Sequence, residues 1–111
     1  MLFDKITIIG IGLIGSSLAR VIMKKGLAGK LCACDKNKEY LAEARELGIV
    51  DEISEDLGKA VENADLVVYA TPVGAYGEIT RQIVPHLKKG VILTDVGSIK
   101  KYSIREIEEN L

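Results

Sequence analysis

Residues 5–15 read KITIIGIGLIG, a short β-branched run that passes directly into a glycine-rich turn. The run from Lys5 to Ile9 predicts a strand, because β-branched residues that stop at glycine are typical of strands. From Leu13 to about Lys25 the apolar spacing becomes helical. The residues expected on the buried stripe of this helix are Ile14, Leu18, Val21 and Ile22.

The turn between this strand and this helix matches the pattern G-x-G-x-x-G. Gly10 permits the tight turn off the strand, Gly12 lets backbone approach a pyrophosphate, and Gly15 lets the helix pack close to the sheet. The helix N-terminus then offers free N–H groups and a partial positive charge to the phosphates. We therefore expect a dinucleotide to be held by Gly10, Ile11, Gly12, Leu13, Ile14 and Gly15.

An acid follows at the spacing that such a site requires. Asp35 lies twenty residues after Gly15, at the end of a second predicted strand over residues 30–34. A carboxylate there accepts hydrogen bonds from the adenosine ribose and repels a 2′-phosphate, so NAD is favoured over NADP. Lys36 and Lys38 would partly offset that repulsion, although both are also ordinary surface lysines. A glycine turn that merely packs, without a ligand, is the other interpretation.

The remaining chain keeps alternating strands and helices. Further strands are predicted near residues 51–53, 65–70 and 91–94, and further helices over residues 38–47, 56–63, 75–87 and 98–111. Asn37 can cap the helix over residues 38–47, whose expected buried stripe is Leu41, Ala44 and Leu47. Pro85 is expected to disturb the last turn of the helix over residues 75–87. Five strands and five helices in alternation predict an α/β, doubly wound parallel sheet of the Rossmann type. The expected order is one strand short of the six in the arrangement 3-2-1-4-5-6. We treat residues 1–111 as one dinucleotide-binding domain.

Two further segments are expected at the carboxyl edge of this sheet, where ligands of such folds bind. Thr71, Pro72 and Val73 follow the fourth strand and would line the nicotinamide side of the cleft. Residues 95–98 follow the fifth strand and bring the Ser98 hydroxyl to a helix start, where it also fits an ordinary N-cap.

Composition excludes several function classes. The 111 residues carry a net charge of −1, which leaves no basic footprint for nucleic acid. No apolar run approaches the length of a membrane span, and no secretory signal is present, so a cytoplasmic location is expected. Cys32 and Cys34 are expected in the core, without a metal site. His86 follows Pro85 at the end of a predicted surface helix, away from the cleft, and no residue stands out as a catalytic acid or base.

Three stretches together resemble the N-terminal nucleotide-binding half of the prephenate/arogenate dehydrogenase family. They are residues 8–19, 70–73 and 94–100, and the last is the most particular to that family. The resemblance implies oxidation of prephenate or arogenate in tyrosine biosynthesis, with hydride transfer to NAD and loss of carbon dioxide. It also implies that Ser98 lies beside the ring hydroxyl of the substrate and helps to orient the catalytic base.

The family places its catalytic histidine in a Gly-His-Pro segment and completes the substrate site with an all-helical C-terminal domain. Neither feature, nor a sixth strand, is found in the 111 residues. We therefore expect the chain alone to bind NAD without oxidising prephenate, the substrate being reached through a missing C-terminal domain, and we expect exposed apolar surface to favour homo-oligomers. Two alternatives stay open: the nucleotide half of another reductase, such as a 3-hydroxyacid dehydrogenase or a pyrroline-carboxylate reductase, and a non-catalytic dinucleotide-sensing or partner-binding module.

Overall fold

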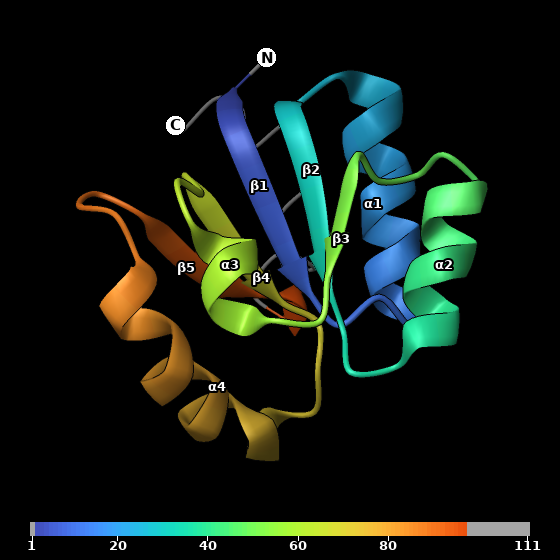
Figure 1. Ribbon diagram of the computed structural model, residues 1–111. Helices are drawn as coiled ribbons and strands as arrows, with labels where there is room; N and C mark the ends of the chain where they lie inside the picture. Colours follow the sequence, from blue (N-terminus) through green and yellow to red (C-terminus); the bar gives the residue numbers. More distant parts are fainter. Residues whose placement is uncertain (1, 98–111) are drawn as a thin grey trace.

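A five-stranded, all-parallel sheet forms the centre of the computed structural model, which describes residues 2–97 (Figure 1). Its strands are β1 (Phe3–Ile9), β2 (Ala28–Cys34), β3 (Glu52–Ser54), β4 (Leu66–Tyr69) and β5 (Ile92–Asp95). They lie in the order β3-β2-β1-β4-β5, so the order reverses between β1 and β4. The doubly wound arrangement predicted from the sequence is confirmed.

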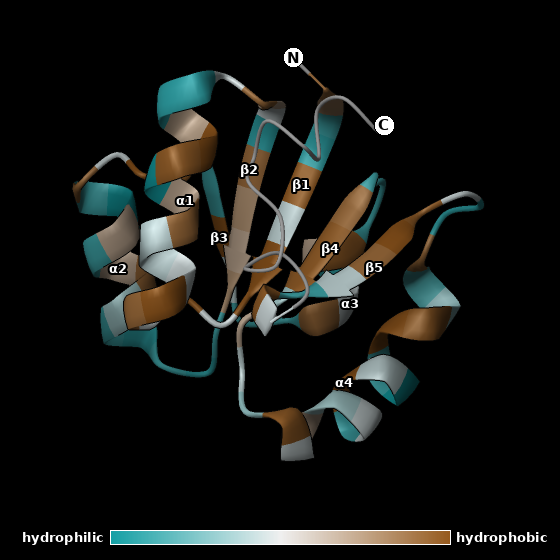
Figure 2. Ribbon diagram, turned by 180° about the vertical axis from the view of Figure 1, so that it is seen from behind, coloured by the Kyte–Doolittle hydropathy of each residue, from teal (hydrophilic) through white to brown (hydrophobic). Residues whose placement is uncertain are grey.

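Helices cover both faces of the sheet (Figures 1 and 2). They are α1 (Leu13–Lys25), α2 (Lys38–Glu46), α3 (Leu57–Val61) and α4 (Tyr76–Ile83), with short 3-10 turns η1 (Val73–Ala75) and η2 (Val84–His86) on either side of α4. One apolar core joins α1 and α2 to the sheet through Ala19, Ile22 and Leu41. A second core, on the opposite face, joins α3 and α4 through Val61, Ile79 and Ile83.

The predicted helix boundaries are largely confirmed, but two predicted core residues are wrong. Helix α1 buries its small side, Gly15 and Ala19, together with Ile22, so that Ile14 points away and is 44% exposed. Leu47 is 55% exposed because α2 ends one residue earlier. Gly48 then adopts a left-handed backbone conformation, and the next residue, Ile49, is buried instead of Leu47.

Helix α4 ends where the sequence predicts a disturbance. Pro85 is the second residue of η2, which directly follows α4, because proline cannot continue the hydrogen-bond ladder. Tyr69 of β4 holds α4 against the sheet: its hydroxyl lies 2.6 Å from that of Thr80, and its ring meets Tyr76 edge-on at 5.0 Å. The predicted helix over residues 98–111 lies outside the described residues.

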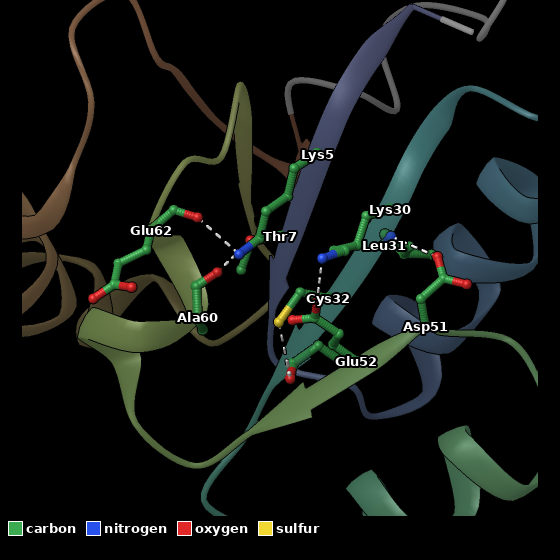
Figure 3. Close-up of polar contacts among 10 residues, drawn as sticks. Lys5, Thr7, Lys30, Leu31, Cys32, Asp51, Glu52, Ala60 and Glu62 are labelled. Atoms are coloured by element: carbon green, nitrogen blue, oxygen red, sulfur yellow. Dashed lines mark hydrogen bonds and ion pairs between the residues drawn. The ribbon is translucent and has the colours of Figure 1, made fainter.

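Polar side chains tie β1, β2 and β3 to their neighbours (Figure 3). The Lys30 Nζ lies 2.7 Å from Glu52 Oε1 across the β2–β3 pair. Thr7, fully buried in β1, donates its hydroxyl to the Ala60 carbonyl at 2.6 Å. These two contacts satisfy polar groups within the strands, and neither is made at the carboxyl edge of the sheet.

The two cysteines are core residues, as predicted. Cys32 and Cys34 are free thiols that pack with Ala60 under α3. Burial raises the pKa of the Cys32 thiol to about 11 and that of Cys34 to about 12, so both are protonated and poorly nucleophilic at neutral pH. Within residues 2–97 no helix is long and apolar enough to cross a membrane, and no group of three His, Cys, Asp or Glu side chains is placed to hold a metal ion.

Candidate functional site

The glycine turn leaves β1 in a conformation that side chains disfavour. Gly10 has a φ of +96°, and its N–H donates to the Cys34 carbonyl at 2.7 Å. A Cβ at Gly10 would lie 2.8 Å from the Ala70 carbonyl oxygen and 2.9 Å from Thr71 Cγ2. Glycine is therefore required here both for the backbone angle and for the close approach of the chain after β4.

Gly15 is required for a different reason. A Cβ on this residue would lie 2.0 Å from the Gly10 carbonyl oxygen, a distance that no backbone adjustment of a few tenths of an ångström relieves. The first turn of α1 is thus packed directly on the glycine turn. This contact aims the N-terminus of α1 at the carboxyl edge of the sheet.

The N-terminus of α1 carries no side-chain cap. Its N-cap residue is Gly12, which makes no side-chain hydrogen bond, and a Cβ there would meet only Tyr40 Cε2, at 4.0 Å. The nearby hydroxyls are engaged elsewhere, since Ser16 donates to the Ile11 carbonyl at 2.9 Å and Ser17 to the Leu13 carbonyl at 3.0 Å. Backbone N–H groups and the helix dipole are therefore what this end offers to an anion.

Asp35 joins the end of β2 to the glycine turn. Its Oδ2 accepts the Ile11 N–H at 2.8 Å, and its Oδ1 accepts the Asn37 N–H at 2.9 Å. Each carboxylate oxygen has a second lone pair, so Asp35 keeps the capacity to accept from a ligand hydroxyl. Asn37 in turn caps α2 by accepting from the backbone N–H groups of Glu39 and Tyr40.

The segment after β4 contributes a hydroxyl without a partner. Thr71 Oγ1 is buried and has no hydrogen-bond partner among residues 2–97. A buried, unsatisfied hydroxyl is unfavourable unless a ligand or water completes it. The following Pro72 is exposed, and Val73, 76% exposed, begins η1.

A cleft of about 510 Å³ brings several of the predicted residues together. Gly10, Asp35, Thr71 and Pro72 all line it, from the carboxyl ends of β1, β2 and β4. Ile11, Gly12 and Leu13 line a smaller cavity of about 320 Å³ beside α1 and α2. Neither cavity is lined by Ile14, Gly15 or Val73.

Sequence patterns did not single out several residues that line the larger cleft. Leu57, Ala75 and Ile79 supply apolar surface, whereas Glu55, Glu78 and Gln82 supply polar groups. Glu55 directly follows the end of β3, and Glu78 and Gln82 are four residues apart, hence on one face of α4. The sequence shows these residues and their spacing, but only the arrangement of β3 and α4 around β1 brings them to the same cleft.

Two further residues from the sequence analysis are Ser98, a predicted site residue, and His86, which the sequence places away from the cleft. Ser98 lies outside the described residues. His86 is exposed in η2, and its ring packs on α3, where a Cβ at Gly58 would lie 2.7 Å from its Nε2. It does not line the cleft.

Comparison with known proteins identifies the family. The sequence profile described as "Prephenate dehydrogenase, nucleotide-binding domain" matches residues 18–111. The chain belongs to this family. A cyclohexadienyl dehydrogenase of Zymomonas mobilis is 39% identical to this chain over 109 residues. These residues cover 98% of this chain and 37% of that protein. The resemblance to the prephenate dehydrogenase family seen in the sequence is confirmed.

Solved structures of the same family have the same fold. The prephenate dehydrogenase from A. aeolicus, in complex with hydroxyphenyl propionate and NAD+, superposes with a TM-score of 0.76 at 28% identity, over 83% of this chain and 32% of that one. The arogenate dehydrogenase of Synechocystis also gives 0.76, at 31% identity over 82% of this chain and 32% of that one. The chain thus spans about a third of the length of these three relatives.

Proposed function

We propose that this chain binds NAD in the 510 Å³ cleft and forms the cofactor-binding part of an enzyme that oxidises prephenate or arogenate. The observation that carries this proposal is the convergence of Gly10, Asp35 and Thr71. These residues are far apart in the sequence and meet where the strand order reverses between β1 and β4. Ligands of doubly wound folds bind at such a switch point, beyond the carboxyl ends of the strands.

The residues present fit a dinucleotide. The uncapped N-terminus of α1 offers backbone N–H groups to a pyrophosphate, and Gly12 keeps that approach free of side chains. Asp35 is placed to accept the hydroxyls of the adenosine ribose, and the unpartnered Thr71 Oγ1 offers a further polar contact. The cleft volume lies within the range of small-molecule sites, about 300–1,000 Å³.

The same carboxylate supports the choice of NAD rather than NADP. A 2′-phosphate would be placed beside Asp35, and two negative charges in a partly buried cleft repel each other. Asp35 is partly buried and already accepts two backbone N–H groups, which hold its carboxylate in place. The repulsion therefore cannot be relieved by a simple side-chain rotation.

In the whole enzyme, bound NAD supplies a hydride acceptor for the substrate ring as carbon dioxide leaves. The residues of this chain bind and orient: the glycine turn holds the pyrophosphate, Asp35 the ribose, and residues 71–73 the nicotinamide end. We assign Ser98 the supporting role of orienting the catalytic base beside the substrate hydroxyl. The family's catalytic histidine and helical domain are required for turnover, so we propose that this chain alone binds NAD without oxidising prephenate.

Two further aspects of the proposal concern assembly and location. Ile92 and Leu93 of β5 are 39% and 42% exposed, which fits packing against a further domain or a second copy. We place the enzyme in the cytoplasm, where the two free thiols would stay reduced.

Titration of the 111-residue chain with NAD tests the binding proposal. We expect saturable binding by calorimetry and stabilisation of roughly 2.7 kcal/mol when NAD is present at about 100 times its dissociation constant. Absence of both signals would overturn the assignment of the cleft. In a parallel assay with prephenate and NAD, we expect no NADH absorbance above background, and measurable turnover would contradict the proposal that this chain alone is inactive.

A further inference from the structure

The cleft beside Asp35 is more acidic than a single ribose-binding carboxylate requires. In the described part of the chain its lining includes four carboxylates, those of Asp35, Glu55, Asp56 and Glu78, and one cation, Lys36. Asp56 has a structural task, since its side chain caps α3 by accepting the Lys59 N–H at 3.1 Å. Glu55 and Glu78 cap no helix.

Glu55 pairs with one of the lysines that follow Asp35, and Glu78 lines the same cleft as the other. Glu55 Oε1 lies 3.9 Å from Lys38 Nζ, at the β3 side of the cleft. On the α4 side, Glu78 hydrogen-bonds to Arg81 and, at 3.1 Å, to Gln82. The Arg81 and Gln82 contacts hold the pKa of Glu78 below its ordinary value, and the positive charge of Lys36 lowers it further.

This arrangement bears on the phosphate that distinguishes NADP from NAD. Lys36 and Lys38 are the cations nearest in sequence to the ribose-binding carboxylate, and a 2′-phosphate needs such cations as partners. In this chain, Lys38 faces Glu55, and Lys36 shares the cleft with Glu78. A phosphate that enters would meet the carboxylates of Asp35, Glu55 and Glu78 in one cleft, and Lys38 already lies 3.9 Å from Glu55.

We propose that Glu55 and Glu78 are determinants of cofactor choice that act with Asp35, because both place negative charge where a 2′-phosphate would enter and Glu55 also engages Lys38, one of the two lysines that would otherwise bind it. The inference rests on the proposed location of the adenosine in this cleft. It predicts that neutralising Asp35 alone leaves the preference for NAD only partly relaxed. The two lysines attract a phosphate without opposing carboxylates only when the glutamates are neutralised as well.

The test measures dissociation constants for NAD and for NADP by calorimetry at two salt concentrations. The variants are Asp35→Asn, the double variant Glu55→Gln/Glu78→Gln, and the triple variant that combines all three changes. We expect the ratio of NADP to NAD affinity to rise about tenfold in Asp35→Asn and about three- to tenfold more for each added glutamine, as for charges separated by several ångströms at a wet surface. The gain should shrink at high salt, because exposed charges are screened.

A matched control separates a local effect from net charge. Glu46→Gln/Glu62→Gln removes two glutamate charges at positions that line neither cavity, and should change the affinity ratio less than twofold. Adding Lys36→Gln to the triple variant should reverse much of its gain. Thermal melting of each variant in the absence of ligand checks that it is folded.

The outcomes distinguish this inference from the proposed function. If the wild-type chain binds neither dinucleotide, the cleft assignment itself fails. If it binds NAD but the triple variant has the same affinity ratio as Asp35→Asn, or if the Glu46→Gln/Glu62→Gln control shifts the ratio equally, the role of Glu55 and Glu78 is wrong. A reversal by Lys36→Gln supports it.

Discussion

The two ends of the parallel sheet differ in whether side chains of this protein satisfy their polar groups. At the amino end, the Asp65 carboxylate accepts the N–H groups of Asp4 and Lys5, each at 2.9 Å, and pairs with Lys88. At the carboxyl end, the N-terminus of α1 has no side-chain cap, and Thr71 Oγ1 is buried without a partner in the described chain. One end is closed by a side chain of this protein, and we propose that a ligand completes the other.

This difference shows how one sheet can separate stability from binding. Both ends belong to the same strands, so the backbone hydrogen bonds of the sheet do not distinguish one end from the other. Asp65 closes the start of β1 and β4, while glycines at the other end keep side chains out of the space in front of α1. Substitutions at the amino end should therefore change the free energy of unfolding, and those at the carboxyl end should chiefly change affinity for NAD.

The largest effect is expected where the glycine turn supports both properties. In Gly15→Ala the added Cβ would lie 2.0 Å from the Gly10 carbonyl oxygen, so α1 must move off the turn. We expect a loss of roughly 3 kcal/mol in the free energy of unfolding, typical of severe overpacking, and no measurable NAD binding. Urea denaturation and calorimetry measure the two quantities.

Gly77→Ala is the matched control for that change. Gly77 lies in α4, and a Cβ there would meet no atom within 4 Å. The alanine should stabilise the helix by about 0.5–1 kcal/mol and leave NAD affinity unchanged. If Gly15→Ala behaves in the same way, the packing of α1 on the glycine turn does not position the site.

A smaller effect, chiefly on affinity, is expected at Asp35, the proposed ribose-binding carboxylate. Asp35→Asn removes the charge and keeps one acceptor oxygen, for the Ile11 N–H, so that the Asn37 N–H loses its acceptor and stability should fall by about 1 kcal/mol. Loss of charge-assisted hydrogen bonds to the ribose should weaken NAD binding about 10- to 100-fold. Calorimetry with NAD measures this, and an unchanged dissociation constant would show that Asp35 serves the fold alone.

The amino end should give the reverse result. Asp65→Asn should cost about 1–2 kcal/mol of stability, because a charged acceptor of several hydrogen bonds is lost. The dissociation constant of NAD should stay within twofold. The exposed Asp4→Asn is the control and should change neither quantity.

The pH dependence of stability tests the same contact. The Lys88 hydrogen bond, with the backbone N–H of Lys5, lowers the pKa of Asp65 in the folded protein. The contribution of the Asp65 carboxylate to the free energy of unfolding is therefore fully present above the pKa of an aspartate in the unfolded chain, about 4. It is lost as the pH falls from there through the lower folded value. Between pH 5 and pH 3 the wild-type chain should lose more stability than Asp65→Asn, and parallel losses would contradict this role.

The smallest predicted effect concerns the unpartnered hydroxyl. In Thr71→Val the shape is kept and only Oγ1 is removed, so stability should change by less than about 0.5 kcal/mol or rise slightly. NAD affinity should fall about two- to tenfold, the range of one neutral hydrogen bond. A destabilised variant with unchanged affinity would mean that the hydroxyl has a partner within the fold.

Local chemistry explains which features could be predicted from the sequence. The glycine turn, the Asn37 cap of α2 and the end of α4 near Pro85 depend on neighbouring residues, and the structure confirms them. The exposure of Ile14 could not be predicted, because the face of α1 that meets the sheet is selected by its contact with Gly10. The arrival of Glu55 beside Asp35 likewise depends on how β3 pairs with β2.

Amide chemical-shift mapping of the ¹⁵N-labelled chain during titration with NAD tests the central claim, that the carboxyl end of the sheet is the binding end. We predict saturable shifts at Gly10, Gly12, Asp35 and Thr71, with the amide of Asp65 unchanged. Shifts that instead cluster around Asp65, or a spectrum unaltered by NAD, would contradict the account.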